Sequence, residues 1–520
     1  MSIDIYWAGL LLLAPLVGTV ARWNEIAAFV AKLRGRTTTG KTIAIGSHDV
    51  EARRFKSTFL WVYLLVMGAE WLQGPFTYTL FRHEKALTES TVALFYIITY
   101  TGAALSSLFT GYLTDRFGRR RACLCFCFIH ALAAVTVYSD QLSILALGRV
   151  LAGIGITLLW TAFESWMIAE YNERGLEESE LTLGAMFAGM TTANCLTAIF
   201  AGILGHCVVF VMGSKVVPFL FGIVLDLIAA ILMVQTWSEN RGTPPSSAPD
   251  EEGLKQEPFA SSLFGGRAYG FTKDARVWSI SFATCCFEGT LFLFLFFWPG
   301  ALQDAHGVSS EDDTIPHGVI FACFMASMVL GALGFNILIS HHPPSSSNAL
   351  ENPIKPHTST PTRLLGTALL LAAVGFLIAA FIEHELSSFF AFLLIEACNG
   401  VYVPSIAYHR GIIVEDKDRA RVYSLMNIPL FVFVVLALSS TVDSDGGGHG
   451  AHRKTVFVFC ATILLAATVV VFLLINLGQV SQGFHPVPSK DENKEIISVE
   501  MPLSMHEDMC VHEIAKGVRV

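Results

Sequence analysis

Few charged residues lie inside the long apolar stretches of this sequence, where an ionised side chain is costly. The main set is one arginine and four glutamates, with Asp226 as an outlier: Glu70, Arg149, Glu164, Glu288 and Glu396. Ionisable side chains within membrane-spanning segments usually face a partner or a water-filled cavity, and they commonly mark ion and proton pathways. We therefore predict that these five residues line a polar path through an apolar protein.

Arg149 is the residue in this set with the fewest ways to be accommodated. A guanidinium cannot shed its proton, so a buried arginine requires a carboxylate or an anion beside it. Two interpretations stay open: a structural ion pair with Glu70 or another glutamate, and a contact with an anionic substrate that can alternate with that pair. Gly153 and Gly155 follow Arg149 at a spacing that lets a neighbouring helix approach closely.

The glutamates suggest proton transfer. A carboxyl group in a hydrocarbon environment can hold a proton at neutral pH, so Glu70, Glu288 and Glu396 suit proton coupling. The alternative is a neutral acid that only hydrogen-bonds neighbouring helices. Glu164 has an alternative of its own, which is pairing with the arginines of residues 116–121.

Several uncharged or isolated polar residues accompany these charges. Gln73 lies one turn from Glu70 and shares its face, and Asn399 lies three residues after Glu396. We include Gln73 and Asn399 in the predicted path. Three weaker candidates fit hydrogen bonds between helices better: Asn194, Asp226 and Asn427.

The elements that must position these residues are membrane-spanning helices. Hydrophobic residues make up 53% of the chain and charged residues only 15%, against about 25% in a typical soluble domain. Thirteen apolar segments approach the roughly 20 residues needed to cross a bilayer. They lie at about 5–28, 58–81, 92–113, 122–139, 142–170, 182–205, 207–236, 276–303, 316–340, 362–383, 387–411, 420–440 and 453–477.

The distribution of basic residues predicts the orientation. Most of the 34 lysines and arginines lie in alternate connecting segments and the tail, and short loops rich in these residues stay in the cytosol. The predicted outer loops hold only five: Arg82, Lys85, Lys215, Arg453 and Lys454. The N-terminus is therefore expected outside or in a lumen, and the C-terminus in the cytosol. No Lys or Arg precedes the first segment, which argues against a cleaved signal peptide.

The predicted layout is an all-α polytopic protein with two six-helix halves and one extra helix. Residues 1–30 hold the extra helix, 31–57 a basic cytoplasmic loop, 58–236 the N-terminal half, 237–275 a polar linker, 276–478 the C-terminal half and 479–520 a disordered tail. Counted from residue 58, the five charged residues lie on helices 1, 4, 4, 7 and 10. These are the first helices of four successive groups of three, which is the strongest internal sign of a shared cavity.

The short loop at residues 115–121 reads Asp115-Arg116-Phe117-Gly118-Arg119-Arg120-Arg121. Gly118 permits the tight turn between two apolar segments. The loop resembles the helix 2–3 signature of the major facilitator superfamily. The resemblance implies a secondary transporter in which Asp115, Arg116, Gly118, Arg119 and Arg120 form a cytoplasmic gate, and in which helices 1, 4, 7 and 10 line the substrate path. The second half has no clean copy of this loop.

Further stretches narrow the resemblance to one branch of that superfamily. They recur in order across about 400 residues, at 70–75, 162–166, 287–298, 318–327 and 392–405. They are similar to the molybdate-anion transporter group, an atypical branch with an extra N-terminal helix. The resemblance implies uptake of the molybdate oxyanion, with proton coupling as an accompanying expectation. By the residues alone, Arg149 with Gln73 and Asn399 could bind a tetrahedral dianion, but four carboxylates would repel it unless most are protonated or paired.

Two other functions stay open: a facilitator for another small organic solute or ion, and a membrane sensor that does not transport. The sequence carries no Gly-Lys phosphate loop, hydrolase elbow or HExxH motif, so we expect no enzyme and no ATP-driven pump. Its 11 cysteines lack paired zinc spacing, and we expect no metal and no cofactor. The expected partners are a small-molecule substrate, protons and the lipid bilayer, without nucleic acid. We expect a monomer in the plasma membrane, with an endomembrane as the alternative.

Overall fold

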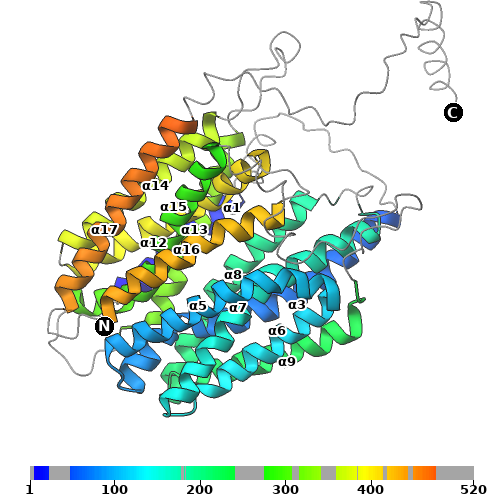
Figure 1. Cartoon of the computed structure of the whole chain (residues 1–520), viewed down its shortest axis with the longest axis horizontal. Coiled ribbons are helices and arrows are strands. Elements are labelled where there is room, and N and C mark those ends of the chain that lie inside the picture. Colours follow the sequence, from blue (N-terminus) through cyan, green and yellow to red (C-terminus); the bar gives the residue numbers. More distant parts are fainter. Residues whose placement is uncertain are drawn as a thin grey trace, which may run out of the picture. The chain divides into compact units, whose positions relative to one another are not determined.

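The computed structural model describes residues 5–22, 47–176, 181, 183–240, 275–306, 315–340, 359–382, 384–413, 419–442 and 449–475. Helices make up almost all of this part of the chain, and it contains no strand (Figure 1). This confirms the all-α class. The long helices are α1 (Ile5–Ala21), α3 (Ser47–Gln73), α5 (Glu89–Phe117), α6 (Arg119–Thr136), α7 (Leu142–Glu173), α8 (Leu183–Met212), α9 (Val217–Thr236), α12 (Ala275–His306), α13 (His317–Ser340), α14 (Ser359–Phe381), α15 (Glu385–Ile413), α16 (Arg419–Val442) and α17 (His449–Val470).

These thirteen helices correspond in order to the thirteen predicted spans. The shortest has 17 residues and the longest 32. Within the described residues, nine meet both the length and the apolar composition needed to cross a bilayer. Two more, α1 and the second part of α16, are apolar but shorter. The helices α3 and α6 are less apolar on average. The first turns of α3 carry charged residues, and α6 begins with three arginines.

The first helix of the N-terminal half differs from the predicted span at both ends. The span was expected at 58–81 after a loop at 31–57, but α3 begins at Ser47, so part of that basic segment is helical. Its regular turns end at Gln73 because Pro75 has no N–H to donate and Gly74 is a weak helix former. A 3₁₀ turn η1 (Gly74–Phe76), a short turn α4 (Thr77–Thr79) and a π-helical turn η2 (Leu80–Glu84) follow. The Gly74-Pro75 pair in the sequence predicts an interruption of the helix, and the structure contains one there.

The helices pack in two sets. In the first, α5 and α6 both contact α7, and α3 contacts α8 and α9. In the second, α13 and α14 both contact α15, and α12 contacts α16 and α17. The pairs α5–α16 and α8–α13 connect the two sets, and α1 packs on α13. All of these helices belong to one compact unit. Residues 241–274 of the expected linker and the expected tail at 479–520 lie outside the described residues.

Glycine allows the tightest of these helix contacts. A Cβ at Gly153 of α7 would lie closer to the Thr99 carbonyl oxygen of α5 than real Cβ contacts ever do. Gly202 of α8 and Gly318 of α13 face one another in the same way across the two sets. Because glycine has no side chain, the backbones can approach and gain dispersion contacts. The close approach predicted after Arg149 is thus confirmed at Gly153.

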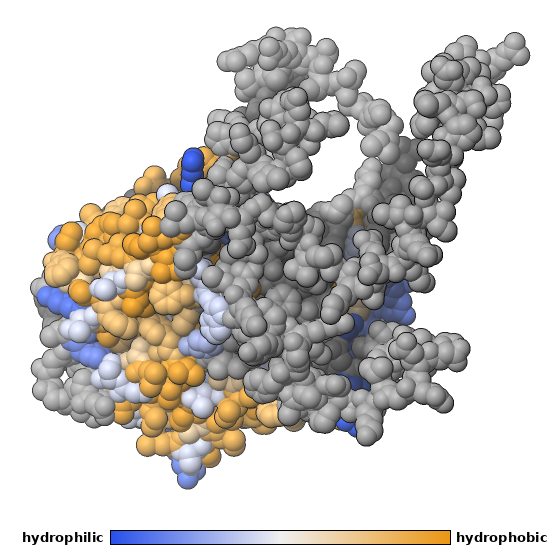
Figure 2. Space-filling model, turned by 45° about the horizontal axis from the view of Figure 1, so that its top comes forward, coloured by the Kyte–Doolittle hydropathy of each residue, from blue (hydrophilic) through white to orange (hydrophobic). Residues whose placement is uncertain are grey.

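The described surface is strongly apolar. Figure 2 shows hydrophobic side chains covering most of the coloured atoms on the face in view. Large exposed side chains include Leu12, Phe200, Phe210 and Val211, each more than 70% exposed. A soluble monomer rarely exposes a contiguous apolar surface of this extent, so this surface suits contact with lipid.

Candidate functional site

Arg149 projects from α7 into a buried position beside aromatic rings. Its side chain is 8% exposed, and its guanidinium carbon lies 5.2 Å from the ring centroid of Phe81. The Nε atom is buried and has no hydrogen-bond partner in the described part of the chain. Among the described residues, the guanidinium has no carboxylate within 4 Å, although Glu70 and Tyr96 lie close enough to interact with it electrostatically. Of the two interpretations left open for Arg149, the direct ion pair with Glu70 is therefore absent among the described residues.

Glu70 pairs instead with a histidine. Its Oε2 lies 3.1 Å from Nε2 of His130 on α6, and Nδ1 of the same ring lies 2.6 Å from Oδ2 of Asp226 on α9. The amide nitrogen of Gln73 lies 3.2 Å from Nε2 of His130. Phe126 stacks on the imidazole, with ring centroids 5.2 Å apart. Three helices thus bring two carboxylates and one imidazole together in the interior of the first set.

His130 is a functional candidate that sequence reasoning missed, and Asp226 was considered only as helix-packing support. A single histidine in an apolar helix is ambiguous, because its ring is often hydrogen-bonded to backbone. A signal was available, since His130 and Asp226 are both ionisable residues in predicted spans. Their partnership needed the packing of α6 against α9, which the sequence does not reveal.

Glu288 on α12 also has a basic partner. Its Oε1 lies 3.1 Å from Nη2 of Arg410 and accepts a hydrogen bond of 3.0 Å from the Tyr402 hydroxyl, both on α15. Arg410 also donates to Oγ1 of Thr284, one turn before Glu288. The predicted span at 387–411 ends just after Arg410, and Arg410 was not included in the predicted path. In the structure α15 continues to Ile413 and Arg410 contacts α12, so Arg149 is not the only cation packed against these helices.

Glu396 is buried in the second set, with Asn399 as its hydrogen-bond partner. The Asn399 amide donates to Oε2 of Glu396 at 3.1 Å and also lies 3.7 Å from the sulfur of Met328 on α13. Glu396 is 2% exposed and interacts electrostatically with Cys195 of α8. The two residues predicted at this end of the path therefore do contact one another, where α15 meets α8 and α13.

The remaining polar candidates lie apart from these groups. Glu164 is exposed on α7 and interacts electrostatically with Tyr63 of α3. The Asn194 amide oxygen accepts a 2.7 Å hydrogen bond from Nε1 of Trp71, which fits the helix-to-helix role expected of it. The side chain of Asn427 lies outside the described residues.

The ends of the two sets that are predicted to face outside carry a further buried charge cluster. Arg453 of α17 was expected in an outer loop, but it is buried between α5 and α12. It pairs with Glu89 of α5 and Asp304 of α12, and it donates to the carbonyl oxygen of Gly300. Hydropathy placed it at the edge of a span, and only the packing shows that it bridges the two sets.

Comparison with known proteins decides the family. A family model described as sugar transporters with twelve transmembrane helices matches residues 20–348. A molybdate-anion transporter of Takifugu rubripes is 30% identical over 455 residues, which cover 82% of this chain and 88% of that protein. The chain belongs to the major facilitator superfamily, in its molybdate-anion transporter group. Molybdate-anion transporters of Danio rerio and Xenopus tropicalis are 29% and 26% identical over 82% and 92% of this chain.

Solved structures of the superfamily confirm the fold. A peptide transporter of the POT family in complex with 5-aminolevulinic acid has a TM-score of 0.62 over 82% of this chain and 97% of its own, at 12% identity. The nucleoside transporter NupG has a TM-score of 0.57 over 82% of this chain and 99% of its own, at 10% identity. This multi-pass membrane protein therefore has the major facilitator fold, with α1 as the additional N-terminal helix.

The arginine turn of this facilitator holds the chain that follows α9. Gly118 has φ +115°, a conformation that favours glycine, and a Cβ there would collide with the Glu239 carboxylate. That carboxylate accepts from the Arg120 backbone N–H at 3.0 Å, and it lies 3.9 and 3.8 Å from the guanidinium nitrogens of Arg120 and Arg121. The Arg119 N–H donates to the carbonyl of Asn240. The Asp115 side chain lies outside the described residues.

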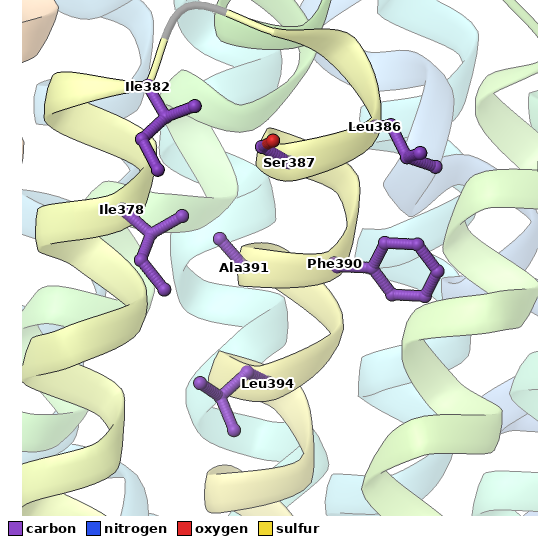
Figure 3. Close-up of a pocket in the computed structure, with 7 residues that line it drawn as sticks. All are labelled: Ile378, Ile382, Leu386, Ser387, Phe390, Ala391 and Leu394. Atoms are coloured by element: carbon purple, nitrogen blue, oxygen red, sulfur yellow. The ribbon is translucent and has the colours of Figure 1, made fainter.

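An apolar groove of about 400 Å³ lies on the second set of this facilitator, between α14 and α15. Figure 3 shows its lining: Ile378, Ile382, Leu386, Ser387, Phe390, Ala391 and Leu394. The groove holds no charged side chain, and one serine is its only polar side chain, so it does not suit an anion. In the described part of the chain, no three His, Cys, Asp or Glu residues are placed to hold a metal ion.

Proposed function

We propose that this transporter carries the molybdate dianion across the plasma membrane by alternating access, with proton uptake as the driving force. The observation that supports it best is the buried guanidinium of Arg149, whose Nε has no hydrogen-bond partner among the residues that the structure describes. A planar guanidinium presents several N–H donors in a fixed fork that matches two oxygens of a tetrahedral oxyanion. A site of this kind is poorly suited to a neutral solute, because the charge of Arg149 would stay unmatched.

The carboxylates near the predicted path should repel a dianion less strongly than their number suggests. Glu70 and Asp226 share His130, Glu288 pairs with Arg410, and Glu396 accepts from Asn399. Each of them already has a donor, which reduces its repulsion of an incoming dianion. The relatives in three vertebrates are named molybdate-anion transporters, which also favours this substrate.

The test is uptake of labelled molybdate by purified full-length protein in lipid vesicles. We expect saturable uptake that unlabelled tungstate, which has the same shape and charge, inhibits strongly. Sulfate, a smaller tetrahedral dianion, should compete less well. Uptake no greater than in protein-free vesicles would refute the proposal. Binding of molybdate without uptake would instead indicate a sensor, and transport of an organic solute without molybdate transport would indicate a different facilitator.

A further inference from the structure

The Glu70–His130–Asp226 cluster is the most elaborate buried charge group inside one set of helices. The contacts run in sequence, with Glu70 Oε2 3.1 Å from Nε2 and Asp226 Oδ2 2.6 Å from Nδ1 of the imidazole. The Asp226 side chain is 1% exposed, and its other carboxylate oxygen is buried and has no hydrogen-bond partner within the described ranges. A purely structural pair would need only one carboxylate for one imidazole.

Proton counting shows what this arrangement can hold. An imidazole nitrogen and a carboxylate oxygen attract at hydrogen-bond distance only when a proton lies between them. Two such contacts need two protons, whereas a neutral histidine beside two carboxylates supplies one. If both contacts are hydrogen bonds, the cluster holds one further proton, either on the ring or on a carboxyl group; a neutral ring would instead accept from the Gln73 amide at Nε2. If the ring carries both protons, Gln73 presents its amide oxygen to Nε2, because the orientation of an amide is assigned and not observed.

The exposure of the three side chains gives this proton a route. Glu70 is 32% exposed, His130 6% and Asp226 1%. Glu70 is thus the member that water or a cavity can reach, and Asp226 is a fixed counter-charge at the closed end. Gly222, one turn before Asp226 on α9, leaves room for the Gln73 amide beside the ring.

Glu70 also links the cluster to Arg149. The two residues interact electrostatically although they are not paired. The other titratable or charged groups facing the cluster are Cys127 on α6, near Asp226, and Tyr96 on α5, near Arg149. A carboxylate at Glu70 would compete with an oxyanion for Arg149, whereas a Glu70 that is protonated or held by a charged His130 would not.

We propose that Glu70, His130 and Asp226 form the proton-binding site of this transporter, and that Glu70 couples proton binding to anion binding at Arg149. This inference rests on the proposed function. The proton enters at Glu70 and is shared with His130, and its charge is balanced by Asp226. By linkage, a proton that favours the anion is itself bound more tightly when the anion is present. When the proton and the anion are released on the other side of the membrane, the Glu70 carboxylate again competes with an anion for Arg149.

The experiment measures molybdate exchange in vesicles at about pH 6 and about pH 8, together with accumulation driven by a pH gradient. For the natural protein we expect the KM to rise with pH. The KM of His130→Gln should be about tenfold above that of the natural protein at about pH 6, and it should stay high at about pH 8. The reason is that Glu70 is then free to compete with the anion for Arg149. Adding Glu70→Gln to His130→Gln should restore a low KM at both pH values while accumulation stays lost. A structural role for His130 would not produce that rescue.

His409→Gln is the matched control, since His409 is a buried histidine on α15 hydrogen-bonded to Thr362 and not to a carboxylate. It should behave as the natural protein. The proposal is overturned if His130→Gln keeps the pH-dependent KM and the accumulation, or if the double variant has a KM as high as the single one. If His130→Gln fails to fold, the double variant decides by itself, because its KM should not change with pH.

A wrong substrate assignment can be distinguished from a wrong proton site, because the natural protein would then show no molybdate exchange at all. The proton site is tested in that case by infrared difference spectra of the lipid-embedded protein between the same pH values. Histidine-ring and protonated-carboxyl bands should be present for the natural protein and absent for the double variant. Identical spectra for the two proteins would overturn the proton site.

Discussion

Arg453 of α17 and Glu89 of α5 form a buried ion pair between the two sets of helices, with Nη2 and Oε2 2.8 Å apart. The two side chains are 9% and 2% exposed, and two further hydrogen bonds join the same groups. The nearby hydroxyl of Ser90 donates to the carbonyl of Val442 at the end of α16. These contacts hold the ends of the helices that are predicted to face outside, and in an alternating-access cycle they would have to separate and reform.

Removing one member of this pair should be far more damaging than removing both. Arg453→Met removes the guanidinium from the buried Glu89 carboxylate, which typically costs about 3–5 kcal/mol of unfolding free energy. Arg453→Met combined with Glu89→Leu should recover most of that loss, because the carboxylate that then remains, Asp304, is 53% exposed and can be hydrated. Unfolding of the purified variants in detergent measures both quantities. A double variant no more stable than Arg453→Met would show that the pair does not hold the two sets together.

Arg149→Lys should keep the charge and lose the fork. We expect an apparent molybdate KM about ten- to a hundredfold higher, because one charge-assisted hydrogen bond contributes about 1.5–3 kcal/mol. Arg149→Ala should abolish uptake, but it should fold, because no described carboxylate depends on Arg149 for an ion pair. Arg174→Lys is the control, since Arg174 pairs with Glu170 four residues earlier. Normal uptake by Arg149→Ala would move the anion site elsewhere.

Gly153→Ala should lower stability where Gly111→Ala should not. A Cβ at position 153 would meet backbone atoms of Thr99, Gly102 and Ala103, so α5 and α7 would have to separate, at about 1–3 kcal/mol. A Cβ at Gly111 meets nothing within 4 Å, and alanine is the better helix former by about 1 kcal/mol. Melting temperatures of the two variants provide the comparison. Equal melting temperatures would mean that the α5–α7 contact relaxes freely.

Loss of the arginine turn should slow the cycle more than it weakens binding. Arg120→Ala removes the 2.7 Å hydrogen bond from its guanidinium to the carbonyl oxygen of Trp237 and the contact with Glu239, both remote from Arg149 in the chain. We expect a maximal uptake rate about tenfold lower with a KM within about twofold of the natural value. Arg119→Ala and Asp115→Ala are expected to act in the same direction. Unchanged rates in all three variants would remove the gating role.

The sequence by itself determined where the helices lie and which charged residues inside them need a partner or a cavity. Bilayer thickness and the cost of unpaired backbone groups impose long apolar helices, so hydropathy located thirteen of them. The same cost makes each charge in a span conspicuous, which is why Glu70, Arg149, Glu288 and Glu396 stand out from the amino-acid pattern alone. Local chemistry was also readable, as in the break of α3 at Gly74-Pro75 and the turn at Gly118.

Only the tertiary structure decided which charges meet. Whether Glu70 pairs with Arg149 or with His130 depends on which faces of α3, α6, α7 and α9 are in contact, and hydropathy does not specify helix rotation when several faces are apolar. Arg410 and Arg453 lay at predicted span ends, where one more helical turn moves a side chain from water into the protein. Ion pairing acts over a few ångströms between residues distant in the chain, so it follows from packing and not from sequence spacing.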